Sequence, residues 1–247
     1  MKILSWNVLH IIHEINYAYD TSPVLEKYSG NEQIRLNAIA NFISTLLSED
    51  TIICLQEVPG DLLESIDFKN HTLYKHMHSR IPEIKNSEYL KTLYSNPNEY
   101  IVTIVPNVFS VTNINVIEFD EPSENVNKSG KACLFLTLKD LTIGNCHLPF
   151  GSSRRKKALT KLTEFINTKF IDKTYILIGD MNMKAQTLQK WLSNLECDAK
   201  VIEMPSATRK TSKIDHGIVS RGISVLETHV YDNHNMSDHS CISITFK

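Results

Sequence analysis

The chain has 247 residues, 42% of them hydrophobic, which is enough for one large domain with a packed core. Its 26 basic and 28 acidic residues give a formal net charge of −2, so the global charge does not indicate a nucleic-acid binder and any attraction for a polyanion must be local. The five cysteines form no Cys-x-x-Cys pair, which argues against structural zinc and fits a reducing compartment. No apolar stretch approaches the roughly 18–20 residues of a membrane span. We therefore expect a single domain over 1–247 in a monomeric, intracellular protein, cytoplasmic or nuclear and not secreted.

The N-terminal part alternates strands and helices. Short apolar runs predict strands at 2–6 and 51–55. The segment 10–30, of mixed polar and aromatic content, predicts a loop with a helical turn. A helix is expected from Asn31, and a short helix after Pro59, because proline suits a first helical turn. Apolar side chains of the longer helix recur at 3.6-residue spacing and would form one face: Ile34, Ala38, Phe42 and Leu46.

The middle and the C-terminal part contain more strands than helices. Residues 72–142 alternate polar and apolar side chains, which is typical of antiparallel strands. The asparagine-rich stretch 86–127 predicts turns and hairpins. We further expect a helix at 153–170, a strand that ends at Ile178, a short helix around 188–192 and three closing strands after it. This excess of strands predicts two packed sheets covered by helices.

Five polar clusters lie at the ends of short apolar runs. They are Trp6-Asn7, Gln56-Glu57, Gly179-Asp180-Met181-Asn182, Asp215-His216 and Ser237-Asp238-His239. Side chains at strand ends can converge on one rim of a sheet. The repetition of acid, amide and imidazole groups at such positions predicts a carboxylate-lined metal site.

Each cluster taken alone has two interpretations. Glu57 is either a ligand for a hard cation or an ordinary glutamate at a strand end. Asp180 and Asn182, two apart, either deprotonate and hold a water molecule or close the strand with an Asx-turn.

Three further residues remain equally open on their own. Asp215 and His239 either form a carboxylate–imidazole pair, in which the acid fixes the tautomer of the ring, or are unrelated surface residues. His147 ends the strand 141–146, and it either donates to a phosphate oxygen or is structural.

In combination, six short motifs resemble those of the endonuclease/exonuclease/phosphatase superfamily, which has a DNase I-like fold. The resemblance covers nearly the whole chain in the expected order. The motifs are Ile3-Leu4-Ser5-Trp6-Asn7-Val8, Leu55-Gln56-Glu57-Val58, Asn145-Cys146-His147-Leu148, Ile178-Gly179-Asp180-Met181-Asn182, Lys213-Ile214-Asp215-His216 and Ser237-Asp238-His239.

This resemblance implies an α+β, four-layer α/β/β/α sandwich and a phosphodiesterase that depends on Mg²⁺ or Mn²⁺. It implies that Glu57 holds the metal with help from Asn7 and Asp238. Asp180 would orient or deprotonate the attacking water, with Asn182 fixing its position. His239, paired with Asp215, would donate a hydrogen bond to the phosphate in the transition state, and His147 would be a second donor.

Two basic clusters beside the motifs are candidates for binding a nucleic-acid or oligonucleotide substrate. They are Arg154-Arg155-Lys156-Lys157 at a helix start and Arg209, Lys210 and Lys213 before Asp215. A positive groove beside a metal site suits a phosphate backbone, but charge runs of this kind also occur on ordinary solvated surfaces. The second cluster resembles endonucleases of non-LTR retrotransposons, whereas His147-Leu148 before a basic helix resembles deadenylases and 2′,5′-phosphodiesterases.

The sequence departs from the family pattern at three places. No glycine occurs in Glu99–Thr103, Ser240-Cys241 replaces the usual residue and proline after Ser-Asp-His, and Lys213 and His216 replace an arginine and an aromatic residue. These departures concern the subfamily and remove no proposed metal ligand or donor. Two other hypotheses stay open beside the nuclease. One is a phosphomonoesterase acting on an inositol phosphate or related head group, and the other is a catalytically silent binding protein of the same fold.

Overall fold

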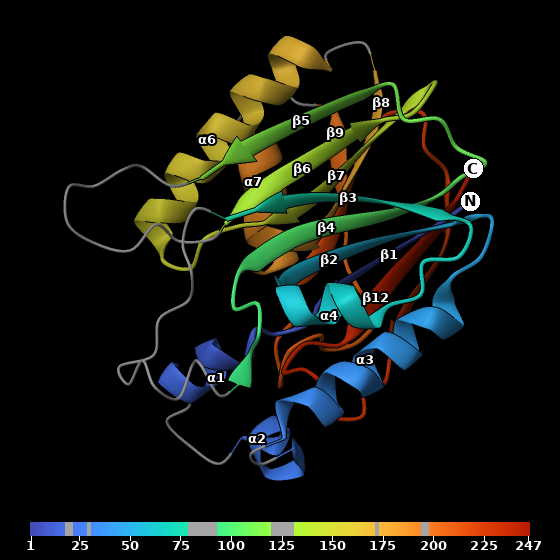
Figure 1. The fold of residues 1–247 in the computed structure, drawn as a ribbon. Helices are drawn as coiled ribbons and strands as arrows, with labels where there is room; N and C mark the ends of the chain where they lie inside the picture. Colours follow the sequence, from blue (N-terminus) through green and yellow to red (C-terminus); the bar gives the residue numbers. More distant parts are fainter. Residues whose placement is uncertain (18–21, 29–30, 79–92, 120–130, 171–172, 194–197) are drawn as a thin grey trace.

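Two six-stranded sheets pack face to face, and helices cover the outer face of each (Figure 1). The computed structural model describes residues 1–17, 22–28, 31–78, 93–119, 131–170, 173–193 and 198–247. The order of the layers is helix, sheet, sheet, helix. The expected α+β, four-layer sandwich is thus confirmed.

The first sheet has the strand order β11-β12-β1-β2-β4-β3. β1 and β2 are parallel, and every other neighbouring pair is antiparallel. The strands are β1 Lys2–Asn7, β2 Thr51–Pro59, β3 His71–Met77, β4 Glu99–Pro106, β11 Val225–Tyr231 and β12 Cys241–Phe246.

The second sheet has the order β5-β6-β7-β8-β10-β9 and the same plan of one parallel pair, β7 with β8, among antiparallel neighbours. The strands are β5 Asn113–Glu118, β6 Ala132–Thr137, β7 Leu141–His147, β8 Thr174–Asp180, β9 Ala199–Ile202 and β10 Asp215–Ser220. A helical crossover joins each parallel pair, as parallel strands require.

Among the described residues, four helices lie by the first sheet and two by the second (Figure 1). Asn31 caps the long helix of the first group, because its Oδ1 accepts the backbone N–H of Ile34 at 3.1 Å. The helices are α1 Ile11–Tyr17, α2 Pro23–Tyr28, α3 Glu32–Leu46, α4 Gly60–Ser65, α6 Ser152–Lys169 and α7 Ala185–Ser193.

Three apolar layers hold the sandwich together. One lies between α3 and the first sheet and contains Leu36, Ile39 and Leu55, and another lies between α6 and the second sheet. The middle layer lies between the two sheets and is formed mostly by β-branched residues such as Ile3 and Ile178. Strands buried on both faces explain why the sequence shows continuous apolar runs at these places.

The elements differ from the sequence expectation in three respects. The segment 10–30 contains two short helices, α1 and α2, where one helical turn in a loop was predicted. Four strands follow α7, not three, because β9 has only four residues and a lysine within it, which gives too weak a pattern to detect. Of the asparagine-rich stretch 86–127, the described part holds β4 and β5, while 79–92 and 120–130 lie outside the described residues.

No helix in the described ranges is long and apolar enough to cross a membrane. Four cysteines of the described chain, Cys54, Cys133, Cys146 and Cys241, are buried and free.

Candidate active site

The ends of strands from both sheets meet at one rim of the sandwich, and their polar side chains form the candidate site. Asn7, His147 and Asp180 are the last residues of β1, β7 and β8, and Asp215 is the first residue of β10. The sheet register places Asp180 directly opposite both His147 and Asp215. Opposite residues carry their side chains on the same face, so the register itself gathers these groups.

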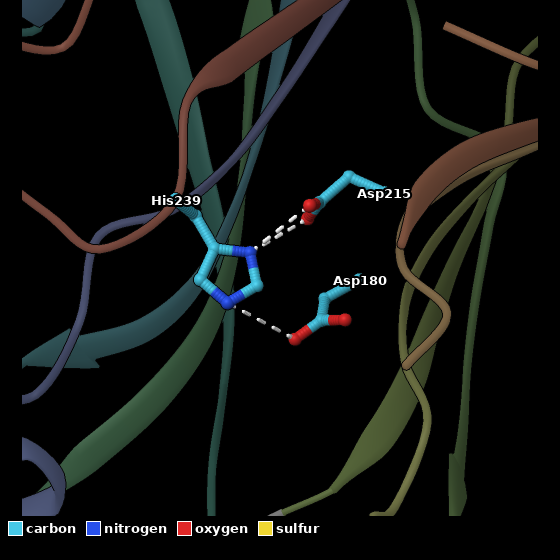
Figure 2. Close-up of side chains that lie close together, drawn as sticks. All are labelled: Asp180, Asp215 and His239. Atoms are coloured by element: carbon cyan, nitrogen blue, oxygen red, sulfur yellow. Dashed lines mark hydrogen bonds and ion pairs between the residues drawn. The ribbon is translucent and has the colours of Figure 1, made fainter. Parts of the chain in front are cut away.

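His239 lies between two carboxylates (Figure 2). Its Nδ1 is 3.1 and 3.0 Å from the two carboxylate oxygens of Asp215, and its Nε2 is 3.8 Å from Oδ2 of Asp180. All three side chains are buried, and their potential ligand atoms lie within 4.8 Å of one another. This group is called the His239 end of the site. Its burial rules out the interpretation of Asp215 and His239 as unrelated surface residues.

The charge state of the His239 end follows from its neighbours. Burial disfavours a charged ring, but the carboxylates of Asp215, Asp238 and Asp180 outweigh it and raise the pKa of His239 to about 10. Burial also opposes ionisation of Asp180, yet His239, His147 and Lys131 together lower the pKa of this carboxyl. At neutral pH the site therefore holds an imidazolium next to an ionised Asp180.

Asp180 and Asn182 form both an Asx-turn and an acid–amide pair, the two interpretations that the sequence left open. The backbone N–H of Asn182 donates to Asp180 Oδ1 at 2.9 Å, which is an Asx-turn, and Asn182 has a left-handed φ of 51°. Its side-chain amide donates to Asp180 Oδ2 at 3.2 Å and to the carbonyl of Leu148 at 2.8 Å. The chain therefore forms the Asx-turn that was one of the two interpretations, and the amide of Asn182 lies against the acid, as the other interpretation requires.

Glu57 lies inside β2, where the sequence predicted that it follows the strand. The register of β2 against β4 shifts between Leu55 and Val58, and Glu57 has a left-handed φ of 53° within this bulge. Bulges re-aim side chains and are common next to active sites. Oε1 of Glu57 lies 3.5 Å from Nε2 of His147, which in turn is 3.3 Å from Asp180 Oδ2.

Lys131 is a site residue that sequence reasoning missed. Its Nζ is 2.8 Å from Glu57 Oε1 and 2.6 Å from His147 Nε2. Burial opposes the charge, but Glu57 and Glu99 outweigh it and raise the pKa of Lys131. Glu57, Lys131 and His147 are called the Glu57 end of the site. The lysine precedes β6 and belongs to no motif, so the sequence gives no signal for it.

Asp238 and Asn7 are already engaged with side chains of this chain. Nε of Arg209 donates to Asp238 Oδ2 at 2.7 Å, while Asp238 Oδ1 is buried and has no hydrogen-bond partner among the described residues. Asn7 accepts the N–H of Leu9 through Oδ1 at 3.0 Å and donates through Nδ2 to Asp180 Oδ2 at 3.3 Å. As placed, Asn7 orients Asp180, and one lone pair of its Oδ1 remains for a further partner.

The two basic clusters contain residues of different kinds. Arg154 and Lys210 are exposed, whereas Arg155 is partly buried and donates to the carbonyl oxygen of Asn182 at 2.5 Å. Lys213 pairs with Glu203 at 3.3 Å. Arg209 contacts Asp238. Of these basic residues, Arg155 and Arg209 therefore contact residues of the candidate site.

A buried arginine supports the backbone under the site. Arg35 is fully buried and ion-paired with Glu32, with NH2 2.6 Å from Oε1. It also donates to three backbone carbonyl oxygens of the segments after Asn7 and before Asp238: Val8 at 2.9 Å, Leu9 at 2.7 Å and Met236 at 2.7 Å. The signal that sequence reasoning passed over is a charged residue on the buried face of a helix.

A second polar contact crosses between the sheets just behind Glu57. The side-chain amide of Asn145 donates to the carbonyls of Leu55 at 3.1 Å and Val102 at 2.7 Å, and its Oδ1 accepts from Gln56 at 2.7 Å. Leu55 and Val102 are paired in the β2–β4 ladder at the position just before the bulge. The amide of Asn145 therefore ties the second sheet to the first directly beside the bulge that contains Glu57.

No family model matches the sequence, and no curated protein matches it significantly. Solved structures do match over the whole chain. An endonuclease/exonuclease/phosphatase from Bacteroides vulgatus is 14% identical with a TM-score of 0.72 and is covered to 98% of its length. The catalytic domain of human Nocturnin, with a bound sulfate anion, is 16% identical with a TM-score of 0.69 and 93% covered. A mannosyl-6-phosphatase from Bacteroides thetaiotaomicron is 14% identical with a TM-score of 0.67 and 99% covered.

These likenesses define the fold. All of this chain aligns with each of the three structures, and its two mixed sheets and outer helices correspond to theirs. The chain therefore has the DNase I-like fold of the endonuclease/exonuclease/phosphatase superfamily, and the predicted resemblance is confirmed at this level.

Proposed function

We propose that this protein is a metal-dependent hydrolase of phosphate esters, and specifically a phosphodiesterase acting on nucleic acid or oligonucleotides. The observation that carries the proposal is the buried His239, held between Asp215 and Asp180 at the rim. A charged ring with one nitrogen fixed by a carboxylate presents the other N–H to an incoming anion. Phosphate esters are the anions that enzymes of this fold hydrolyse.

The chemistry of the proposed donors suits a divalent cation. Glu57 and Asp238 offer carboxylate oxygens and Asn7 an amide oxygen, the hard donors that Mg²⁺ and Mn²⁺ prefer. The buried Oδ1 of Asp238, which has no hydrogen-bond partner among the described residues, suits a cation. Glu57, Asp238 and Asn7 would hold the ion. When bound, it would neutralise charge on the phosphoryl group and on the leaving oxygen.

The chain's own residues would perform the remaining steps. Asp180 is ionised and braced by Asn7 and Asn182, so it can accept a hydrogen bond from a water and then its proton. His239 would donate Nε2–H to a phosphoryl oxygen, and Asp215 would hold the ring in the required orientation. His147, which contacts Asp180 and Glu57, would position both carboxylates or donate to the phosphate.

The substrate class rests on the cations around the rim. Arg209 and Lys131 lie at the site, and the exposed Arg154 and Lys210 lie on segments that lead to it. Phosphodiester backbones attract such groups through charge alone. The similarity to a mannosyl-6-phosphatase supports a second candidate, a phosphomonoesterase acting on a small phosphorylated molecule.

A substrate panel tests the proposal. RNA, DNA, 2′,5′-linked oligoadenylate, inositol phosphates and a sugar 6-phosphate are each incubated with Mg²⁺, Mn²⁺ or EDTA. We expect cleavage of at least one oligonucleotide that stops in EDTA and in His239→Gln, but persists in His234→Gln, a control at an exposed histidine. Hydrolysis of monoesters alone favours the second candidate, and no hydrolysis by folded protein favours a silent binding protein.

A further inference from the structure

The ammonium group of Lys131 is ion-paired with Glu57, the carboxylate proposed to hold the metal. Its ammonium is 2.8 Å from Glu57 Oε1 and 2.6 Å from His147 Nε2. The side chain is 15% exposed and that of Glu57 9% exposed, so this ion pair is largely shielded from water. Such a pair is stronger than a surface salt bridge, because solvent screens it less.

Two buried glutamates on this side of the site each lie against a basic side chain. Glu57 pairs with Lys131, and the neighbouring buried Glu99 pairs with His13, whose Nε2 is 2.7 Å from Glu99 Oε2. Pairing in this way is what allows carboxylates to stay ionised when buried. A divalent ion at Glu57 adds two positive charges beside a carboxylate that already has an ammonium partner.

The ammonium and a metal ion cannot share Glu57 without repelling each other. Mg²⁺ binds carboxylate oxygens at about 2.0–2.1 Å, which places it within a few ångströms of an Nζ that stays at its present distance. The backbone of Lys131 is hydrogen-bonded to the neighbouring chain, since its carbonyl accepts the N–H of Phe119 at 3.0 Å. Its four-carbon side chain has free torsions, so the side chain is the part that would move.

We propose that Lys131 competes with the divalent cation for Glu57 and thereby sets the metal affinity of this site. The inference rests on the proposed function in one respect, the assignment of Glu57 to the metal. It implies that Lys131 holds Glu57 and His147 in place until the metal arrives. It also implies that metal binding releases the ammonium from Glu57.

The test compares Lys131→Met with Lys139→Met. Both remove one lysine charge, but Lys139 is exposed at the turn between β6 and β7, at the other end of that hairpin. Mn²⁺ binding is measured by titration calorimetry without substrate, together with the rise in Tm that Mn²⁺ produces. We expect Lys131→Met to bind Mn²⁺ about tenfold more tightly than the unmodified chain, a change that corresponds to one ion pair, and Lys139→Met to be unchanged.

The outcomes separate this inference from the proposed function. If Glu57→Gln abolishes Mn²⁺ binding but Lys131→Met binds no more tightly than the unmodified chain, the metal site stands and the competition is refuted. If folded Lys131→Met binds no Mn²⁺ while the unmodified chain binds it, the competition is refuted and the metal site stands. If Mn²⁺ binds equally well to Glu57→Gln, the metal is held elsewhere, and both the assignment of Glu57 to the metal and the competition are refuted.

A measurement on the unmodified chain covers the case in which Lys131→Met does not fold. The ¹⁵Nζ signal of Lys131 is identified in a lysine-labelled sample by its loss in Lys131→Arg. We expect this signal to shift when diamagnetic Mg²⁺ saturates the site, and not to shift in Glu57→Gln. A signal that is unchanged while Mg²⁺ binds would refute the competition.

Discussion

The two ends of the site are built in different ways. At the His239 end, Asp180 and Asp215 face each other in the register of β8 and β10, and both oxygens of Asp215 engage the ring. At the Glu57 end, the contacts come from a backbone bulge and a long lysine side chain. Sheet register fixes the first arrangement, whereas side-chain torsions allow the second to change.

This difference separates two kinds of function. Groups that stabilise a transition state are most effective when they need no rearrangement, and the His239 end has that property. A cation site must admit and release its ion, and the Glu57 end has a side chain that can give way. Substitutions at the first end should therefore change the chemical step, and substitutions at the second should change metal dependence.

The largest effect is expected where the backbone of the His239 end is supported. Arg35→Met leaves the buried Glu32 without its ion-pair partner, although the Tyr94 hydroxyl still donates to it at 2.6 Å, and it leaves three carbonyl groups without this donor. Breaking a buried pair of this kind costs about 3–5 kcal/mol, so we expect a loss of this order in the free energy of unfolding. Urea denaturation measures it, with Arg221→Met at an exposed arginine as the control. A loss below about 1 kcal/mol would contradict the role assigned to Arg35.

His239→Gln should abolish most activity while the fold is retained. Loss of one oriented transition-state donor costs about 10²–10³ in kcat, and we expect a decrease in this range with little change in KM. Steady-state kinetics on the substrate found in the panel checks it, at saturating metal. A variant that keeps full kcat would show that the His239 end is not the chemical centre.

Glu57→Gln should act through the metal. We expect kcat/KM at low Mg²⁺ to fall by about 10²-fold, as for loss of one oriented group, with partial recovery as the Mn²⁺ concentration rises. A matched metal titration of His239→Gln should show no such recovery. If the two variants respond alike to metal, the distinction between the two ends fails.

The His13–Glu99 pair beside Glu57 predicts a pH window of stability. Burial opposes the charge of His13, but Glu57 and Glu99 outweigh it and raise the pKa of His13 above 6.5, so its contribution is complete below pH 6.5 and is lost as the pH rises through the raised value. Burial likewise opposes ionisation of Glu99, but His13 lowers the pKa of Glu99 from 4.5 to about 2. Its contribution is therefore complete above pH 4.5 and is lost as the pH falls toward 2.

The difference in unfolding free energy between the unmodified chain and His13→Gln should then be largest between pH 4.5 and 6.5. Urea denaturation over pH 3–9 measures this difference. A difference that stays constant from pH 5 to 9 would show that His13 carries no charge in the folded protein.

The smallest effect is expected at the basic helix start. Arg154 is exposed, so Arg154→Gln should raise KM for an oligonucleotide only about threefold and reduce the salt dependence of binding by about one phosphate contact. Arg155→Gln removes the contact with Asn182 and should lower kcat as well. Equal effects of the two variants would contradict the distinction between a surface arginine and one that contacts the site.

The sequence alone determined the elements that have strong local patterns. The apolar runs before Gln56 and Asp180 are strands because both of their faces are buried, and the helix from Asn31 has its cap and its period in adjacent residues. The polar residues that follow those runs indicated the rim, and the order of the motifs indicated the fold. All of these signals lie within a few residues of one another along the chain.

Only the tertiary structure decided the partners of those residues. Lys131 reaches Glu57 from 74 positions away, Arg35 joins the segments at Val8 and Met236, which are 228 positions apart, and Asn145 binds carbonyls of the other sheet. Such contacts bring together groups that are distant along the chain, and their energies depend on burial and distance, which a linear pattern does not contain.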